Sequence, residues 1–187
     1  MNVIIFGPPG AGKGTQAINI AKNFNLHQIS TGDLLRNEVK NKTQIGKNIE
    51  NIISKGDFAT DDIVNELIKK IIFDPQKKNK LIFDGYPRSL NQAKNLDLLL
   101  HKSNQKINFI FYLNVIKETI IKRIEKRKIL EKRSDDNLQT ILKRYDTYML
   151  TTRPVLDFYN QNSNFNEIDG SLKIDEITAK IEGFLTV

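Results

Sequence analysis

A glycine-rich segment near the start of the chain has the residue types for binding phosphate. Residues 7–15 read Gly-Pro-Pro-Gly-Ala-Gly-Lys-Gly-Thr and follow an apolar run at 3–6. Glycines let several backbone N–H groups converge on one point, and Lys13 adds an ammonium where the next predicted helix begins. The segment therefore predicts a polyphosphate site, and a nucleotide is the ligand that needs all these features. The alternative is a Gly-Pro surface turn with a solvated lysine.

The match to the general phosphate-loop pattern is incomplete at one position. Gly7, Gly12 and Lys13 fit G-x-x-x-x-G-K-[ST], but Gly14 stands where the pattern has a hydroxyl and Thr15 comes one residue later. Direct ligation of Mg²⁺ by a hydroxyl side chain is therefore in doubt.

Arginines are scarce in this chain, and we treat them as candidate site residues. Only seven of the 29 basic residues are arginine. Lysine serves for ordinary surface charge, whereas the rigid arginine fork suits a phosphate or a carboxylate. The seven are Arg36, Arg88, Arg123, Arg127, Arg133, Arg144 and Arg153.

A carboxylate ends the apolar run at 81–84, which leads into Gly85-Tyr86-Pro87-Arg88. Asp84 at the end of a buried strand suits an acceptor for Mg²⁺-bound water beside a phosphate loop. Asp-Gly is also a common turn. Together with residues 7–15, the pattern favours the functional interpretation.

The densest basic segment covers residues 122–133. It is either an exposed helix with i,i+4 charge pairs or a nucleic-acid patch. Arg123 and Arg127 project from one helical face. Residues 134–137 then resemble a helix start, where Asp135 and Asp136 either cap the helix or also orient arginines.

Strand and helix patterns alternate along the chain. Strands are predicted at 3–6, 27–30, 81–84, 107–113 and 165–169. Buried strands alternating with helices indicate a doubly wound α/β layer with right-handed crossovers. Between about 30 and 79 no strand pattern occurs, and helices are predicted at 43–54 and 60–72, with Ser30 or Thr31 as a helix cap. This part should be a small helical insertion.

Composition limits the class of protein. The 187 residues suit one domain, and 39% hydrophobic with 27% charged residues is typical of a soluble globular protein. The chain has no cysteine, which excludes disulfides and Cys-ligated zinc. The apolar start is too short for a signal peptide and 107–115 is too short to span a bilayer, so we expect a cytoplasmic protein. The net charge of +7 comes largely from dispersed lysines.

Along almost its whole length the chain resembles the adenylate kinases, in their short-lid form, among the nucleoside monophosphate kinases. The motifs occur in family order: residues 7–15, Ser-Thr-Gly-Asp-Leu-Leu-Arg at 30–36, Asp-Gly-Tyr-Pro-Arg-Ser at 84–89 with Gln92, and Arg-Ser-Asp-Asp-Asn at 133–137. Gly14 is the family's own form of the loop. The resemblance implies a three-layer P-loop α/β fold with a five-stranded parallel sheet flanked by helices.

The resemblance also implies a division of the chain and a reaction. The core would be 1–29, 60–122 and 137–187, the segment that binds the nucleoside monophosphate 30–59, and a short lid 123–136. The reaction would be reversible, Mg²⁺-dependent transfer of the ATP γ-phosphoryl group to AMP. Only about five residues separate Arg127 from Arg133, so most motion should belong to 30–59.

Site residues carry over by position. The implied catalytic residues are Lys13, Arg88, Arg123, Arg127, Arg133 and Arg144. The implied ATP site is Gly10, Ala11, Gly12, Lys13, Gly14, Thr15, Arg123, Arg127, Gly170 and Leu172. The implied AMP site is Thr31, Arg36, Asp57, Phe58, Ala59, Gly85, Tyr86, Arg88, Gln92, Arg133 and Arg144. Asp84 and Asp33 would order water around Mg²⁺, and Arg153 has no implied role.

Such an inventory fits phosphoryl transfer. Charge on the transferring oxygens is neutralised by arginines, Lys13 and Mg²⁺, and AMP needs no general base because a phosphomonoester's second pKa is about 6. His27 and His101 are therefore ordinary polar residues. The expected partners are ATP, AMP and ADP, with no structural zinc, no nucleic acid, no membrane and a monomeric state.

Two other functions stay open from the sequence. A UMP/CMP kinase would have other residues at positions 31 and 92, whereas a glutamine amide such as that of Gln92 can pair with adenine. A nucleotide-dependent switch or nucleic-acid-binding protein could use 122–133, but aromatic residues are not interleaved there and no guanine-specifying Asn-Lys-x-Asp occurs.

Overall fold

The computed structural model describes residues 1–55, 57, 59–131 and 138–186, with only the backbone described for 127–131 and 138. Within these residues a parallel sheet of five strands has the order β2-β3-β1-β4-β5. The strands are β1 (Asn2–Phe6), β2 (His27–Ser30), β3 (Leu81–Asp84), β4 (Phe109–Asn114) and β5 (Phe165–Asp169). The predicted fold class and all five predicted strands are confirmed.

The fourth strand begins two residues later than predicted. Asn2 donates its backbone N–H to the side-chain Oδ1 of Asn108 at 2.8 Å, and Asn108 N–H bonds to Asn2 O at 2.8 Å. The Asn108 side chain therefore accepts a hydrogen bond that a backbone carbonyl would accept in a regular parallel pair, and regular pairing starts where Val3 meets Phe109. The hydrophobicity of residues 107–113 does not indicate this side-chain bond.

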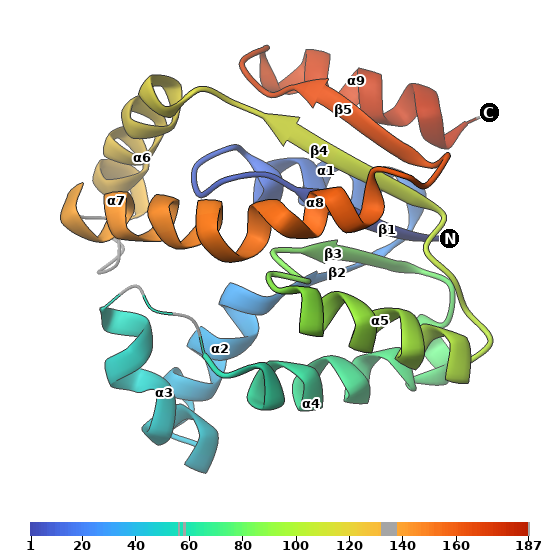
Figure 1. The fold of residues 1–187 in the computed structure, drawn as a ribbon, viewed down its shortest axis with the longest axis horizontal. Helices are drawn as coiled ribbons and strands as arrows, with labels where there is room; N and C mark the ends of the chain where they lie inside the picture. Colours follow the sequence, from blue (N-terminus) through green and yellow to red (C-terminus); the bar gives the residue numbers. More distant parts are fainter. Residues whose placement is uncertain (56, 58, 132–137, 187) are drawn as a thin grey trace.

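Helices cover both faces of the sheet because successive strand residues point to opposite sides. Val3 and Ile5 of β1 pack with α1 (Lys13–Phe24) and α9 (Ile174–Leu185). Ile4 and Phe6 pack in the other core cluster with α5 (Leu90–Lys102) and α8 (Arg153–Tyr159). Figure 1 shows α1 and α8 on opposite sides of the strands. The three-layer arrangement follows.

Three helices make up the predicted insertion: α2 (Thr31–Lys40), α3 (Gln44–Ser54) and α4 (Asp61–Ile72). The Ser30 hydroxyl caps α2 by accepting the Asp33 N–H at 3.3 Å. Figure 1 shows α2 and α3 projecting from the sheet at the lower left, whereas α4 lies against α5. Val64, Ile68 and Ile72 accordingly belong to the main core.

The remaining elements surround the other end of the sheet. A 3₁₀ turn (η1, Pro75–Lys77) precedes β3. The basic helix α6 (Lys117–Glu131) is followed by α7 (Leu138–Thr147), which runs through one π-helical turn (η2, Tyr148–Thr152) into α8. Among the described residues, no helix has the combined length and apolar character needed to cross a bilayer.

Two helical glycines give a matched test of this packing. A Cβ on Gly46 of α3 would lie 2.0 Å from the carbonyl oxygen of Glu38 in α2, whereas one on Gly183 of α9 would have no atom within 4 Å. Gly46→Ala should destabilise the protein by about 1–3 kcal/mol through overpacking. Gly183→Ala should stabilise it by up to about 1 kcal/mol through helix propensity. Urea unfolding measures both, and equal stability of the two variants would contradict the close α2–α3 contact.

Candidate active site

The phosphate-loop segment has the backbone form that its glycines allow. Gly10 and Gly12 have φ of 81° and 96°, a left-handed conformation that side chains disfavour. Gly12 caps α1, which begins at Lys13 as predicted. A Cβ on Gly12 would meet nothing within 4 Å, so the space in front of the first turn of α1 is open. The positive end of the α1 helix dipole faces this space.

Lys13 lies over the loop itself. Its Nζ donates to Gly7 O at 2.7 Å and to Pro8 O at 3.0 Å. A second cation reaches the loop from α6, because Arg123 Nη1 donates to Ala11 O at 3.2 Å. Side chains from two elements therefore place positive charge beside the open loop.

The parallel sheet brings three loops to the same edge. In register, Ile5 of β1 pairs with Asp84 of β3, and Asp84 pairs with Ser30 of β2. The segments that follow these strands are the phosphate loop, the start of α2 and residues 85–88. Ligands of open α/β sheets bind at this carboxyl edge.

Arg88 is held at the centre of this edge by backbone and hydroxyl oxygens. Its Nε donates to Gly85 O at 2.6 Å and its Nη2 to Thr31 Oγ1 at 3.3 Å, while Thr31 Oγ1 donates to Gly85 O at 2.8 Å. The pKa of Arg88 is lowered to about 10, mainly by burial. The positive charges of Arg144 and Arg36 also lower this pKa, whereas the negative charge of Asp84 raises it. Positive charge outweighs negative charge here, which favours an anionic ligand.

Two cavities meet at these arginines. The α2 cavity is lined by Thr31, Gly32, Leu35, Arg36, Ile53, Asp57, Ala59, Val64, Gly85, Arg88, Gln92 and Arg144. The loop cavity is lined by Ile5, Phe6, Gly7, Pro9, Lys13, Gly85, Pro87, Arg88, Arg144, Tyr148 and Thr152. Gly85, Arg88 and Arg144 line both. One set of guanidiniums therefore faces two adjoining spaces.

Asp84 lies beside the start of α1. Its Oδ2 accepts from Gln28 Nε2 at 3.3 Å and would lie 3.3 Å from a Cβ on Gly14. Glycine at position 14 thus leaves room for this carboxylate, which gives a physical reason for its departure from the general loop pattern. Asp33, the other predicted acidic residue, forms an ion pair with Arg36.

Comparison with known proteins agrees with this geometry. The family model described as adenylate kinase matches residues 5–164. The chain belongs to the adenylate kinase family. It is 48% identical to the adenylate kinase of Pelagibacter ubique, over the whole of both chains. It is 37% identical to that of Leifsonia xyli, covering 96% of this chain and 90% of the relative, and 35% identical to that of Caulobacter sp. strain K31, covering 100% and 99%. As a member of this family, it is a phosphotransferase.

The structure brings most of the residues predicted for the adenylate kinase AMP site into one place. Eight line the α2 cavity: Thr31, Arg36, Asp57, Ala59, Gly85, Arg88, Gln92 and Arg144. Tyr86 lines neither cavity; its hydroxyl donates to Asn65 Oδ1 at 2.8 Å, and burial raises its pKa to about 12. Phe58 and Arg133 lie outside the described residues, as does the side chain of Arg127.

The residues predicted to contact the adenine of ATP, Gly170 and Leu172, lie outside the two cavities. Gly170 N–H donates to Asn114 O at 2.8 Å, and Leu172 packs against the core cluster that contains α1 and α9. Neither residue lines the α2 cavity or the loop cavity. Their contact with adenine stays a prediction. Arg153, which had no implied role, lies near Asp157 at 3.9 Å and over the Tyr112 ring.

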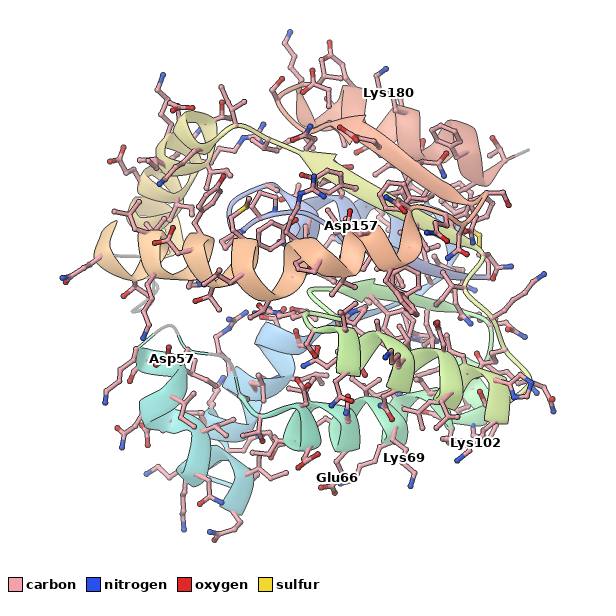
Figure 2. The ribbon with its side chains drawn as sticks, in the orientation of Figure 1. Asp57, Glu66, Lys69, Lys102, Asp157 and Lys180 are labelled. Atoms are coloured by element: carbon pink, nitrogen blue, oxygen red, sulfur yellow. The ribbon has the colours of Figure 1, made fainter. Side chains whose placement is uncertain are left out.

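Sequence reasoning missed three polar residues around the site. Asp61 Oδ1 accepts from Gln92 Nε2 at 2.6 Å, and Thr152 Oγ1 donates to Arg88 O at 3.0 Å. Lys143 of α7 contacts Asp57 Oδ1 at 2.6 Å, across from the helical insertion; Figure 2 shows Asp57 on the part of the insertion nearest α7. From the sequence alone, Asp61 would be predicted only as a residue at the start of a helix, and Lys143 only as a surface charge. Only tertiary structure reveals their partners.

The lowered pKa of Arg88 predicts a proton linkage. A bound phosphate dianion favours the charged form of the Arg88 guanidinium, whose pKa is lowered in the free protein. Binding of AMP should therefore be accompanied by proton uptake at Arg88 that is larger at pH 9.5 than at pH 7.5. Calorimetry with AMP in two buffers of different ionisation enthalpy measures the uptake.

The control for this linkage is Lys13→Met. A lysine side chain also loses its proton at high pH, and this variant removes the lysine that lines the loop cavity. The uptake should persist in that variant if it comes from Arg88. Equal proton exchange at pH 7.5 and 9.5 in the wild type would contradict the crowding of positive charge around Arg88.

Proposed function

We propose that this enzyme transfers the γ-phosphoryl group of ATP reversibly to AMP at the wall shared by the loop cavity and the α2 cavity. The observation that carries the proposal is that Arg88 and Arg144 line both cavities. Two nucleotides bound end to end need positive charge where their phosphates meet. The family of the chain supports the same reaction.

ATP would bind with its phosphates over the open first turn of α1. The N–H groups of residues 10–15 would surround the β- and γ-phosphates, and Lys13 would move from the carbonyls of Gly7 and Pro8 to the transferring group. Arg123, already within reach of Ala11 O, would add charge from α6. We assign Arg127 a similar role by family position alone.

AMP would occupy the α2 cavity. Arg36, Arg88 and Arg144 would hold its phosphate, and Gln92 would face its base. Arg133 is assigned to the meeting point of the phosphates by position in the family. The attacking oxygen belongs to a phosphate that is largely ionised at neutral pH, so no residue has to remove a proton. Alignment and charge neutralisation are then the protein's main contributions.

Mg²⁺ normally accompanies ATP in this family, where it neutralises charge on the β- and γ-phosphates. The Asp84 carboxylate fits an acceptor for metal-bound water because it lies next to the start of α1. Its Oδ2 accepts from Gln28 Nε2 at 3.3 Å, and the two oxygens of a carboxylate can accept several further donors. Asp33 would serve as a second acceptor once separated from Arg36.

The division of the chain also enters as a proposal, with a core of 1–29, 60–122 and 137–187. Residues 30–59 would close over AMP, and the Asp57–Lys143 contact supports this because it joins the insertion to α7. The lid, 123–136, would be short. The full alignment with the Pelagibacter relative extends over 213 residues, so that protein has residues with no counterpart among these 187. We further infer a cytoplasmic monomer that needs neither nucleic acid nor membrane.

Removing either central cation should abolish most activity. Lys13→Ala or Arg88→Ala should lower kcat by about 10³ or more, by analogy with arginine-finger losses, while the fold stays intact. A coupled assay of ADP formed from ATP and AMP, with and without Mg²⁺, measures turnover, and circular dichroism monitors folding. The matched control is Lys22→Ala, an exposed lysine in the last turn of α1.

The control should keep wild-type turnover. Near-normal activity of Lys13→Ala or Arg88→Ala would remove the role assigned to that residue. Faster turnover with UMP or CMP than with AMP would assign the enzyme to the other branch of nucleoside monophosphate kinases.

A further inference from the structure

The side-chain amide of Gln92 lies between two groups of opposite hydrogen-bonding character. Its Oε1 accepts from the backbone N–H of Arg88 at 2.7 Å, and its Nε2 donates to Asp61 Oδ1 at 2.6 Å. A backbone N–H can only donate and an ionised carboxylate can only accept. Rotating the amide by half a turn would place two donors together on one side and two acceptors together on the other. The amide therefore has one permitted orientation.

Asp61 is itself fixed by donors from the start of α5. Its Oδ2 accepts from the Ser89 hydroxyl at 2.8 Å and from Asn91 Nδ2 at 3.2 Å. Ser89 Oγ also accepts the backbone N–H of Gln92 at 3.1 Å. The carboxylate thus connects the first turn of α4 to the first turn of α5, and it cannot turn away from Gln92 without losing these bonds.

The amide keeps hydrogen-bonding capacity toward the α2 cavity, which Gln92 lines although it is only 4% exposed. A glutamine oxygen has two lone pairs and its nitrogen two hydrogens. One of each is used by Arg88 and Asp61, which leaves one acceptor and one donor. This pair matches the 6-amino group and N1 of adenine, whereas a 6-oxo purine presents an acceptor and an N–H in the reverse order.

We propose that Asp61 is a positioning residue that sets the base specificity of the enzyme by fixing the orientation of the Gln92 amide. The proposal rests on the proposed function, in which AMP occupies the α2 cavity with its base toward Gln92. Asp61 does not touch the base; it allows the amide to accept 6-amino purines and reject 6-oxo purines. A site built on such fixed polar groups discriminates strongly, because the wrong base leaves them unpaired.

The test compares AMP with inosine monophosphate, which has a 6-oxo group and an N1–H in place of the 6-amino group and bare N1. Calorimetry without ATP gives both dissociation constants. The wild type should favour AMP by at least about a hundredfold. Asp61→Asn keeps the side-chain size but offers one acceptor oxygen to three donors, so this preference should fall by about tenfold or more.

The matched control is Asp62→Asn. Asp62 is the neighbouring acid in the same first turn of α4 and is exposed, so its loss reproduces the change in helix-end charge without touching Gln92. Its AMP preference should stay within about twofold of the wild type. Asn91→Ala, which removes one donor to Asp61, should lower the preference by a smaller factor, about two- to threefold, and serves if Asp61→Asn does not fold.

The ratio of the two dissociation constants separates positioning from a structural role. If Asp61 only supported the fold, its substitution would weaken both nucleotides equally, and an unchanged ratio in the folded variants would overturn the proposal. A wild type that binds both nucleotides equally would also overturn it. The proposed function is judged separately, because it fails if the wild type forms no ADP from ATP and AMP whatever the binding ratio.

Discussion

Crowding of positive charge at the carboxyl edge of the sheet is the constraint on which the rest of this structure depends. Arg36, Arg88 and Arg144 line one cavity, and burial together with its neighbours lowers the pKa of Arg88 to about 10. Asp84 offsets only part of this charge. Like charges held together in a partly enclosed space cost stability in the free protein, and a phosphate relieves that cost. Such an arrangement makes sense for a protein that binds and transfers phosphate.

The scaffold holds this unfavourable arrangement through backbone oxygens. Gly85 O accepts from Arg88 and from Thr31, and Arg88 O accepts from Thr152 of the π-helical turn. Parallel pairing brings the segments after β1, β2 and β3 to one edge, although they are far apart in sequence. The cations are thus placed by segments that follow buried strands, and the α2–α3 region projects from the sheet beside them. Fixed placement of charge suits a reaction whose catalysis rests on positioning and charge neutralisation.

Much of the fold could be predicted because its signals are local. Five apolar runs, the glycine-rich loop before α1 and the helical insertion all have patterns within a few residues, and the family motifs predict which residues form the site. What sequence could not show depends on partners distant in the chain. Asp61 and Gln92, which are hydrogen-bonded, are 31 residues apart in the chain. The Asn108 side chain accepts the backbone N–H of Asn2, which is more than a hundred residues away. Either Ser30 or Thr31 fits the sequence pattern of an α2 cap; in the structure Ser30 accepts the Asp33 N–H, and the Thr31 hydroxyl donates to Gly85 O instead. The predictions on Phe58 and Arg133 lie outside the described residues.

The central claim is that Arg88 and Arg144 neutralise two nucleotides whose phosphates meet between them. A crystal structure with a bisubstrate analogue, two adenosines joined through a chain of phosphates, tests it most directly. The account predicts that the phosphate chain runs from the first turn of α1 past Lys13 to the guanidiniums of Arg88 and Arg144, with one adenine beside Gln92. A phosphate chain bound elsewhere, with these two guanidiniums making no contact to it, would contradict the account.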